Sequence, residues 1–274
     1  MKGMCDMELN KVNKKVEDIK NNDNIFSVGK VIKVNPYTVI VSGLNDITYY
    51  EEVNIDDKAK GFVFTVGKNN VTISLIEVKE KINLAKVVSF DVFDTLLFRI
   101  TSSPEVIFDL TGEKFGIDNY RNLRMKSQQE ISRIVLKSGK APHADINEIY
   151  TYISEKNPGY DWDKVKNFEL DIEKASVIRN SEIYEIYQYA VEHGKRIIAV
   201  SDMYLDGYFI EELIKQCGYV DIQKVYCSAN LKKTKYEQTI FEEVAKREKV
   251  RPEEIIHIGD NQKSDVELAK KSGW

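Results

Sequence analysis

Asp91, Ser201 and Asp260 stand at the carboxyl ends of three short apolar runs that are typical of buried β-strands. Open parallel sheets place their chemistry at this end of their strands, so we expect the three side chains to lie near one another. Asp265 adds a carboxylate shortly after Asp260, and Lys235 adds a cation at the predicted start of an amphipathic helix. The acidic pair of Asp260 and Asp265 is best explained by a bound cation, because hard divalent ions prefer oxygen ligands.

The sequences around these residues resemble the four motifs of the haloacid dehalogenase (HAD) superfamily. The matching runs are SFDVFDTLLFR at 89–99, AVSDMYL at 199–205, KYEQTIF at 235–241 and HIGDNQKSD at 257–265. They look most like the bacterial members of the superfamily that are associated with glycosyltransferases and surface polysaccharides. The resemblance implies a hydrolase, and first of all a phosphatase that acts on a small phosphorylated substrate such as a sugar phosphate.

The resemblance also implies a nucleophile and a metal site. Asp91 would attack phosphorus and become an aspartyl phosphate, a covalent strategy that splits one difficult step into two. Asp91, Asp260, Asp265 and the main-chain oxygen of Phe93 would be the ligands of Mg²⁺. This cofactor would offset the repulsion between the attacking carboxylate and the anionic substrate.

The residues that would bind phosphate and transfer a proton complete the expected site. Ser201 would donate a hydrogen bond to the phosphoryl group, and Lys235 would fix its charge. One position departs from the phosphatase pattern, since Phe93 stands where most phosphatases of the superfamily carry a second aspartate as general acid and base. Asp94 or Asp202 could take over this task, and spacing alone does not decide between them.

Two other functions stay open. The dehalogenase branch of the superfamily also lacks the second aspartate, and there a carboxylate attacks carbon without a metal ion. The pair of Asp260 and Asp265 speaks against that branch, because it indicates a cation. In the second alternative the HAD core is a silent module, and the N-terminal region mediates subunit assembly in an ATPase-like complex.

Composition narrows the classes of partner. The 274 residues include 40 lysines and arginines against 44 aspartates and glutamates, which leaves no basic surplus for binding nucleic acid. The three cysteines show no CxxC spacing, which argues against a zinc site and a disulfide framework and favours a cytoplasmic location. No apolar run approaches the length of a membrane span, so we expect no membrane insertion.

Two N-terminal segments precede the motifs. Residues 1–22 space their apolar side chains as a solvated amphipathic helix would, and residues 23–79 contain five β-type runs that predict a small antiparallel β-barrel. Through VGKVIKV, VIVSGL and GFVFTVGKNNVTISLI, the second segment resembles the β-barrel of the α/β-type subunits of rotary ATP synthases. This resemblance implies contact with a protein partner. It implies no nucleotide binding, because Asn69 follows Lys68 where a P-loop requires serine or threonine.

The rest of the sequence is expected to form an α/β fold, a Rossmann-like HAD core with a parallel sheet and a helical cap. Residues 84–100 and 194–274 would form the core. Residues 101–193, whose apolar positions recur at three- and four-residue steps, would form the cap over the active site.

The end of the sequence carries one further expectation. The amphipathic run Asp265–Lys271 predicts a helix with Gly273 as its C-cap. In the HAD fold a further strand follows this helix, and here the sequence stops. We therefore expect a fragment whose sheet has an open edge beside the strand of Asp260, with Trp274 poorly buried and a tendency to self-associate.

Overall fold

The computed structural model describes residues 29–34, 38–44, 52–55, 59–66 and 71–274. The chain divides into two compact units, Met1–Asn83 and Leu84–Trp274, and each is described by itself. The helix predicted within residues 1–22 lies outside the described residues. Of the helices that the structure describes, none has both the length and the hydropathy needed to cross a membrane.

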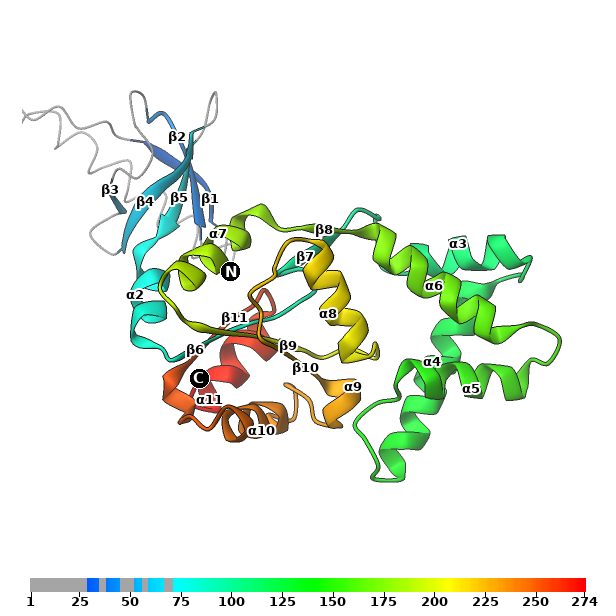
Figure 1. The fold of residues 1–274 in the computed structure, drawn as a ribbon. Helices are drawn as coiled ribbons and strands as arrows, with labels where there is room; N and C mark the ends of the chain where they lie inside the picture. The colour runs from blue at the N-terminus through cyan, green and yellow to red at the C-terminus, as the bar shows by residue number, and fades with distance from the viewer. Residues whose placement is uncertain (1–28, 35–37, 45–51, 56–58, 67–70) are drawn as a thin grey trace, which may run out of the picture. The chain divides into compact units, whose positions relative to one another are not determined.

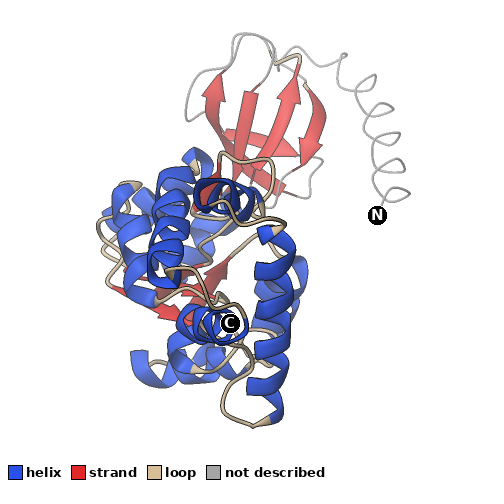
Figure 2. Ribbon diagram, turned by 90° about the vertical axis from the view of Figure 1, so that its right-hand side faces the viewer, coloured by secondary structure: helices blue, strands red, loops and turns tan. Residues whose placement is uncertain are grey.

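The described part of the first unit is a five-stranded antiparallel sheet followed by one helix (Figures 1 and 2). Its elements are β1 (Lys30–Val34), β2 (Thr38–Ser42), β3 (Glu52–Ile55), β4 (Ala59–Val66), β5 (Val71–Leu75) and α2 (Ile76–Leu84). Buried Val39, Val41 and Val63 form a small apolar core. The five predicted β-type runs are confirmed as strands.

The first sheet is not shown to close into a barrel. Its strand order is β1-β2-β5-β4-β3, so β1 and β3 form its two edges. Closing a sheet into a barrel requires its outer strands to pair, and no such pairing occurs among the described residues. Local turn chemistry predicts each hairpin, whereas closure depends on the twist of the whole sheet. The barrel therefore stays a prediction.

A four-stranded parallel sheet forms the centre of the second unit. Its strands are β6 (Val87–Phe90), β9 (Arg196–Ser201), β10 (Lys224–Cys227) and β11 (Ile255–Ile258), in the order β10-β9-β6-β11. Val88 of β6 lies opposite Ile197 of β9 and Ile256 of β11, and both pairings are parallel. All carboxyl ends therefore lie at the same end of the sheet, as predicted. The strand before Asp260, β11, is an edge strand of the described sheet.

Helices connect the strands of this sheet (Figure 1). The connecting helices are α7 (Ser181–Glu192), α8 (Gly207–Gln216), α9 (Ser228–Leu231), α10 (Thr239–Glu248) and the 3₁₀-helix η1 (Pro252–Glu254). The π-helix η2 (Gln262–Leu268) and α11 (Ala269–Lys271) follow β11, the last strand. Phe241 of α10 belongs to the same buried apolar cluster as Ile198 of β9, and the half-buried Trp274 packs on Phe241 with ring centroids 4.9 Å apart. Gly273 adopts a φ of 86°, the left-handed conformation predicted for a C-cap.

The segment between β6 and β9 is mainly helical, and it leaves and rejoins the core through two short paired strands. These are β7 (Leu97–Arg99) and β8 (Val177–Arg179), which run antiparallel and enclose α3 (Val106–Phe115), α4 (Tyr120–Lys137), α5 (Ile146–Lys156) and α6 (Trp162–Ser176). Figure 1 shows these four helices grouped at one side of the parallel sheet. The strand β8 interrupts the range 101–193 that the sequence predicts to be helical, and α7 follows it.

A buried polar network joins the cap helices. The guanidinium of Arg124 on α4 donates two hydrogen bonds to Glu169 on α6, at 3.0 and 2.9 Å, and both side chains are almost fully buried. The hydroxyl of Tyr150 on α5 donates to the same carboxylate at 2.6 Å. Because a buried charge without a partner is very unfavourable, this network fixes how the three helices pack.

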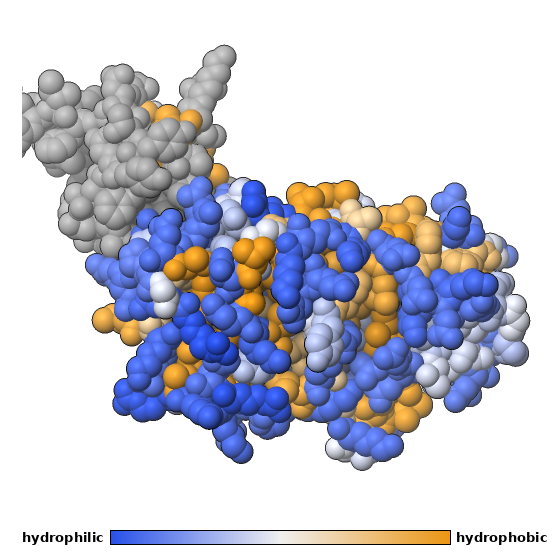
Figure 3. All heavy atoms as spheres, viewed as in Figure 1, coloured by the Kyte–Doolittle hydropathy of each residue, from blue (hydrophilic) through white to orange (hydrophobic). Residues whose placement is uncertain are grey.

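The surface of the second unit is mixed. On the face shown in Figure 3, hydrophilic residues cover most of this unit, and apolar residues lie in patches between them. Exposed apolar side chains include Phe98 of β7 and its cross-strand neighbour Ile178 of β8. Exposed apolar residues in small numbers are usual on globular proteins, so these residues by themselves indicate no function.

Candidate active site

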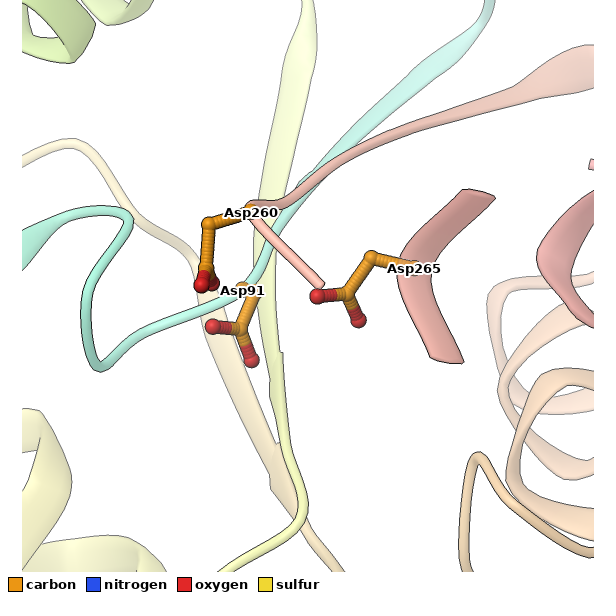
Figure 4. A group of neighbouring side chains, drawn as sticks. All are labelled: Asp91, Asp260 and Asp265. Carbon is orange, nitrogen blue, oxygen red and sulfur yellow. The ribbon is translucent and has the colours of Figure 1, made fainter. Parts of the chain in front are cut away.

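Asp91, Asp260 and Asp265 converge at the carboxyl end of the parallel sheet (Figure 4). One carboxylate oxygen from each lies within 4.8 Å of the others. Asp91 follows β6, and its main-chain N–H donates to the carbonyl of Ile258 in β11 at 2.8 Å, so the strand pairing itself sets the distance between two of the acids. Three carboxylate oxygens at such distances fit a hard divalent cation such as Mg²⁺.

Asp260 is the accessible member of this carboxylate trio. The hydroxyl of Thr95 donates to Asp260 Oδ1 at 3.1 Å and accepts from the Asp260 main-chain N–H at 3.1 Å. Thr95 is buried, so this pair of bonds holds the carboxylate in one orientation. The carboxylate that solvent reaches is thus oriented before any ligand binds.

Asp265 is held from several directions. Its carboxylate accepts hydrogen bonds from the main-chain N–H of Asn261 at 3.1 Å and from His257 Nε2 at 3.2 Å. Gly259 leaves the necessary space, because a Cβ at this position would lie 2.5 Å from the Cβ and Cγ of Asp265. Burial lowers the pKa of His257 to about 4, so this ring is neutral and donates its Nε2 hydrogen while Nδ1 accepts from Ser89.

Lys235 is the cation of the site. Its buried ammonium lies 2.5 Å from Asp91 Oδ1 and 2.7 Å from Asp265 Oδ1. Burial raises the pKa of Asp91 to about 6, although Lys235 acts in the opposite direction. The sequence places Lys235 at a helix start, but it lies in a turn, because Gln238 with a φ of 63° separates it from α10.

Ser201, Asp202, Asp94 and Phe93 all line the same pocket as the trio. Ser201 is buried at the end of β9, while Asp202 and Asp94 are exposed. The Asp202 carboxylate accepts from the main-chain N–H of Lys235 at 2.8 and 3.0 Å. Partial desolvation in the pocket raises the pKa of Asp202. The structure therefore brings every sequence-predicted site residue into one pocket.

The pocket has a volume of about 480 Å³ and also draws residues from the cap. Sequence reasoning missed this cap side, which comprises Arg99, Pro104, Glu105, Phe108, Met125, Gln128, Gln129, Glu173 and also Tyr204 of the core. One signal was available for Glu173. On α6 the acids Glu169 and Glu173 continue the buried positions Trp162 and Val165 at helical spacing. Acidic residues at core positions indicate buried partners.

The family described as hydrolase, haloacid dehalogenase-like hydrolase, matches residues 85–273. No curated protein matches the sequence significantly.

Among solved structures, a 2-haloacid dehalogenase from Pseudomonas syringae pv. tomato DC3000 has a TM-score of 0.50 and 18% identity, covering 69% of this chain and 84% of its own. A protein described as a predicted phosphoglycolate phosphatase, from Haemophilus somnus 129PT, has a TM-score of 0.47 and 14% identity over 69% and 83% of the two chains. The HAD-hydrolase YfnB from Bacillus subtilis, bound to magnesium, has a TM-score of 0.48 and 15% identity over 69% and 86%. At these identities the likeness concerns the fold.

Proposed function

Because the chain belongs to the haloacid dehalogenase-like hydrolase family, we propose that it is a Mg²⁺-dependent phosphohydrolase that acts on a small phosphorylated metabolite, for example a sugar phosphate. The observation that carries the proposal is the convergence of Asp91, Asp260 and Asp265 within 4.8 Å. Lys235 balances only one of these three charges. The excess negative charge favours a divalent cation beside Lys235.

The same observation favours a phosphatase over a dehalogenase. A carboxylate that attacks carbon needs no metal ion, and three crowded acids would then only repel one another. A phosphoryl group brings additional negative charge to Asp91, so its attack requires cations close by. When bound, Mg²⁺ would supply positive charge that offsets the repulsion between the Asp91 carboxylate and the phosphoryl oxygens. Asp260, Asp265 and Asp91 would hold it, with the main-chain oxygen of Phe93 as a further ligand.

In the proposed first step, a carboxylate oxygen of Asp91 attacks phosphorus, and the bond between phosphorus and the ester oxygen breaks. Ser201 and Lys235 hold the phosphoryl oxygens, and Asp94 or Asp202 gives a proton to the departing alkoxide. In the second step, water attacks phosphorus, its proton returns to the same acid, and the aspartyl phosphate separates into inorganic phosphate and the Asp91 carboxylate.

The N-terminal unit has a separate role in this proposal. All residues that line the pocket belong to the second unit, Leu84–Trp274. We propose that residues 23–79 close into the predicted barrel and bind a protein partner, which the antiparallel strand order supports. Catalysis would not depend on this contact.

Phosphate release from a panel of small phosphoesters, with Mg²⁺ or with EDTA, tests the function. Wild-type protein should release phosphate only with Mg²⁺, and Asp91→Asn should lower turnover by about 10³-fold or more, because it removes the nucleophile. Asp171→Asn, which changes an exposed acid of α6, is the matched control and should keep turnover near the wild-type rate.

Three outcomes would contradict the proposal. Halide release from 2-haloacids in EDTA would identify a dehalogenase. A folded protein without either activity would identify a silent module. Wild-type turnover by Asp91→Asn would exclude the aspartyl-phosphate mechanism.

A further inference from the structure

An ion pair between Arg99 and Glu173 forms part of the pocket wall on the cap side. Arg99 ends β7 and Glu173 lies near the end of α6, so the pair joins the two segments that connect cap and core. Both Nε and Nη2 of Arg99 lie 2.8 Å from the same oxygen of Glu173. The side chains are 8% and 5% exposed, and the guanidinium stacks 4.2 Å from the ring centroid of Phe93.

This pair decides which charges the pocket offers to a substrate. Of the described residues that line the pocket, two are cationic, Arg99 and Lys235, and each already contacts a carboxylate. The carboxylates outnumber them, with seven in the lining: Asp91, Asp94, Glu105, Glu173, Asp202, Asp260 and Asp265. A divalent metal ion still leaves the balance negative. Lys235 and the metal serve the phosphoryl group, so no cation remains for a second anionic group.

The other lining residues suit an uncharged molecule. Gln129 of α4 offers an amide donor and acceptor that match hydroxyl groups, and Gln128, whose Oε1 accepts from Arg124 Nη1 at 2.8 Å, offers its amide donors. Phe93, Phe108 and Met125 offer apolar surface for carbon. Of these groups, none carries a charge that would bind a carboxylate or a second phosphate.

We infer that Glu173 sets the charge selectivity of the pocket by occupying Arg99, so that the substrate is a phosphomonoester whose remaining part carries no anionic group. The inference rests on the proposed phosphatase function and names its substrate class. An ionised carboxylate placed beside the engaged Arg99 would also lie beside the Glu173 carboxylate, and like charges repel strongly where one of them is buried. Without Glu173 the same guanidinium would present a rigid fork of donors that matches a carboxylate.

Two phosphoesters that differ in one terminal group test the inference. Hydroxyethyl phosphate ends in an alcohol, and phosphoglycolate ends in a carboxylate. For wild-type protein with Mg²⁺, kcat/KM should favour hydroxyethyl phosphate by about tenfold or more, because the carboxylate meets only negative charge. Glu173→Gln keeps the shape of the side chain and removes the negative charge that balances Arg99, so the ratio should move toward phosphoglycolate by about tenfold or more.

Two variants separate a freed cation from a simple change of charge. Glu105→Gln removes the same unit of charge from the pocket wall but leaves the ion pair between Arg99 and Glu173 in place, so its ratio should shift less than that of Glu173→Gln. The double variant Arg99→Met with Glu173→Gln removes both charges, and its ratio should return toward wild type. If Glu173→Gln does not fold, Glu173→Asp, which withdraws the carboxylate by one methylene group, should shift the ratio less but in the same direction.

The outcomes distinguish the inference from the function on which it rests. The charge selectivity is overturned if wild-type protein has equal kcat/KM for both esters. It is also overturned if Glu173→Gln changes the ratio of the two kcat/KM values by less than about twofold. Either result is compatible with the proposed phosphatase function. Failure of wild-type protein to hydrolyse either ester or any other phosphoester with Mg²⁺ overturns the proposed function itself.

Discussion

Replacing Lys235 by methionine removes the cation that lies between two buried acids. Its ammonium is 2.5 Å from Asp91 Oδ1 and 2.7 Å from Asp265 Oδ1, and the Lys235 side chain is only 2% exposed. Methionine preserves most of the length and the apolar part of the side chain. Lys235→Met therefore leaves two neighbouring carboxylates without their common partner in a region with little water.

The expected loss of stability follows from this burial. Removing one partner of a buried ion pair lowers the free energy of unfolding by about 3–5 kcal/mol. The loss of stability is limited because one of the two aspartates can take up a proton instead of staying charged. Protonating an aspartate at pH 7, when its unfolded pKa is near 3.9, costs about 4 kcal/mol. We therefore expect Lys235→Met to lower the free energy of unfolding by about 3–4 kcal/mol in EDTA.

Lys232→Met provides the matched control. Lys232 lies 3.0 Å from Asp145 Oδ2, but the two side chains are 35% and 27% exposed. Partly exposed ion pairs contribute about 1 kcal/mol or less to the free energy of unfolding. When the proteins are unfolded with urea, Lys232→Met should therefore be half unfolded at nearly the same urea concentration as wild type. Both tryptophans of the chain, Trp162 and Trp274, lie in the second unit, and their fluorescence reports its unfolding separately from the first unit.

Magnesium supplies the decisive comparison. A ligand that binds only the folded state raises the free energy of unfolding by RT ln(1 + [L]/Kd). Without the lysine the site around the three carboxylates has a more negative net charge, so Mg²⁺ should bind Lys235→Met more tightly than wild type. The difference in the free energy of unfolding between the two proteins should therefore be smaller with Mg²⁺ than in EDTA. A loss of stability in EDTA no larger than that of Lys232→Met would refute the role of Lys235 in the charge balance of the site, and a difference in stability that Mg²⁺ leaves unchanged would refute the metal site.

Three further variants address the proton donor and the support of the metal ligands. One of the variants Asp94→Asn and Asp202→Asn should remove the general acid. That variant should lower turnover most for alkyl phosphates and least for an activated aryl phosphate, whose leaving group needs no proton. Equal losses on both kinds of ester would indicate a structural role. Gly259→Ala places a Cβ 2.5 Å from Asp265, so the Mg²⁺ concentration for half-maximal activity should rise by about tenfold or more. An unchanged Mg²⁺ requirement would show that Asp265 is not a ligand.

The sequence by itself determined the strands and the acids that follow them. Runs such as Val87–Phe90 and Ile255–Ile258 consist mainly of apolar residues, and burial on both faces of a sheet is what such runs need. Parallel pairing then places Asp91 and Asp260 at the same end of the sheet. Both steps depend on patterns within a few residues, and the structure agrees with them.

Only the tertiary structure decided which charged side chains contact one another in the site. Lys235 reaches Asp91 across 144 positions from a turn, not from a helix, because the turn conformation depends on contacts with the loop after β9. Closure of the first sheet into a barrel likewise depends on a whole-sheet property that no hairpin reveals.

The cap side of the pocket shows the same limit. Arg99 and Glu173 are 74 positions apart, and neither has a local pattern that names the other. The periodicity of α6 marks Glu173 as a buried position, but burial alone leaves its partner open. The tertiary fold sets the partner by placing the end of β7 beside α6, since a buried carboxylate is stable only where a cation lies next to it.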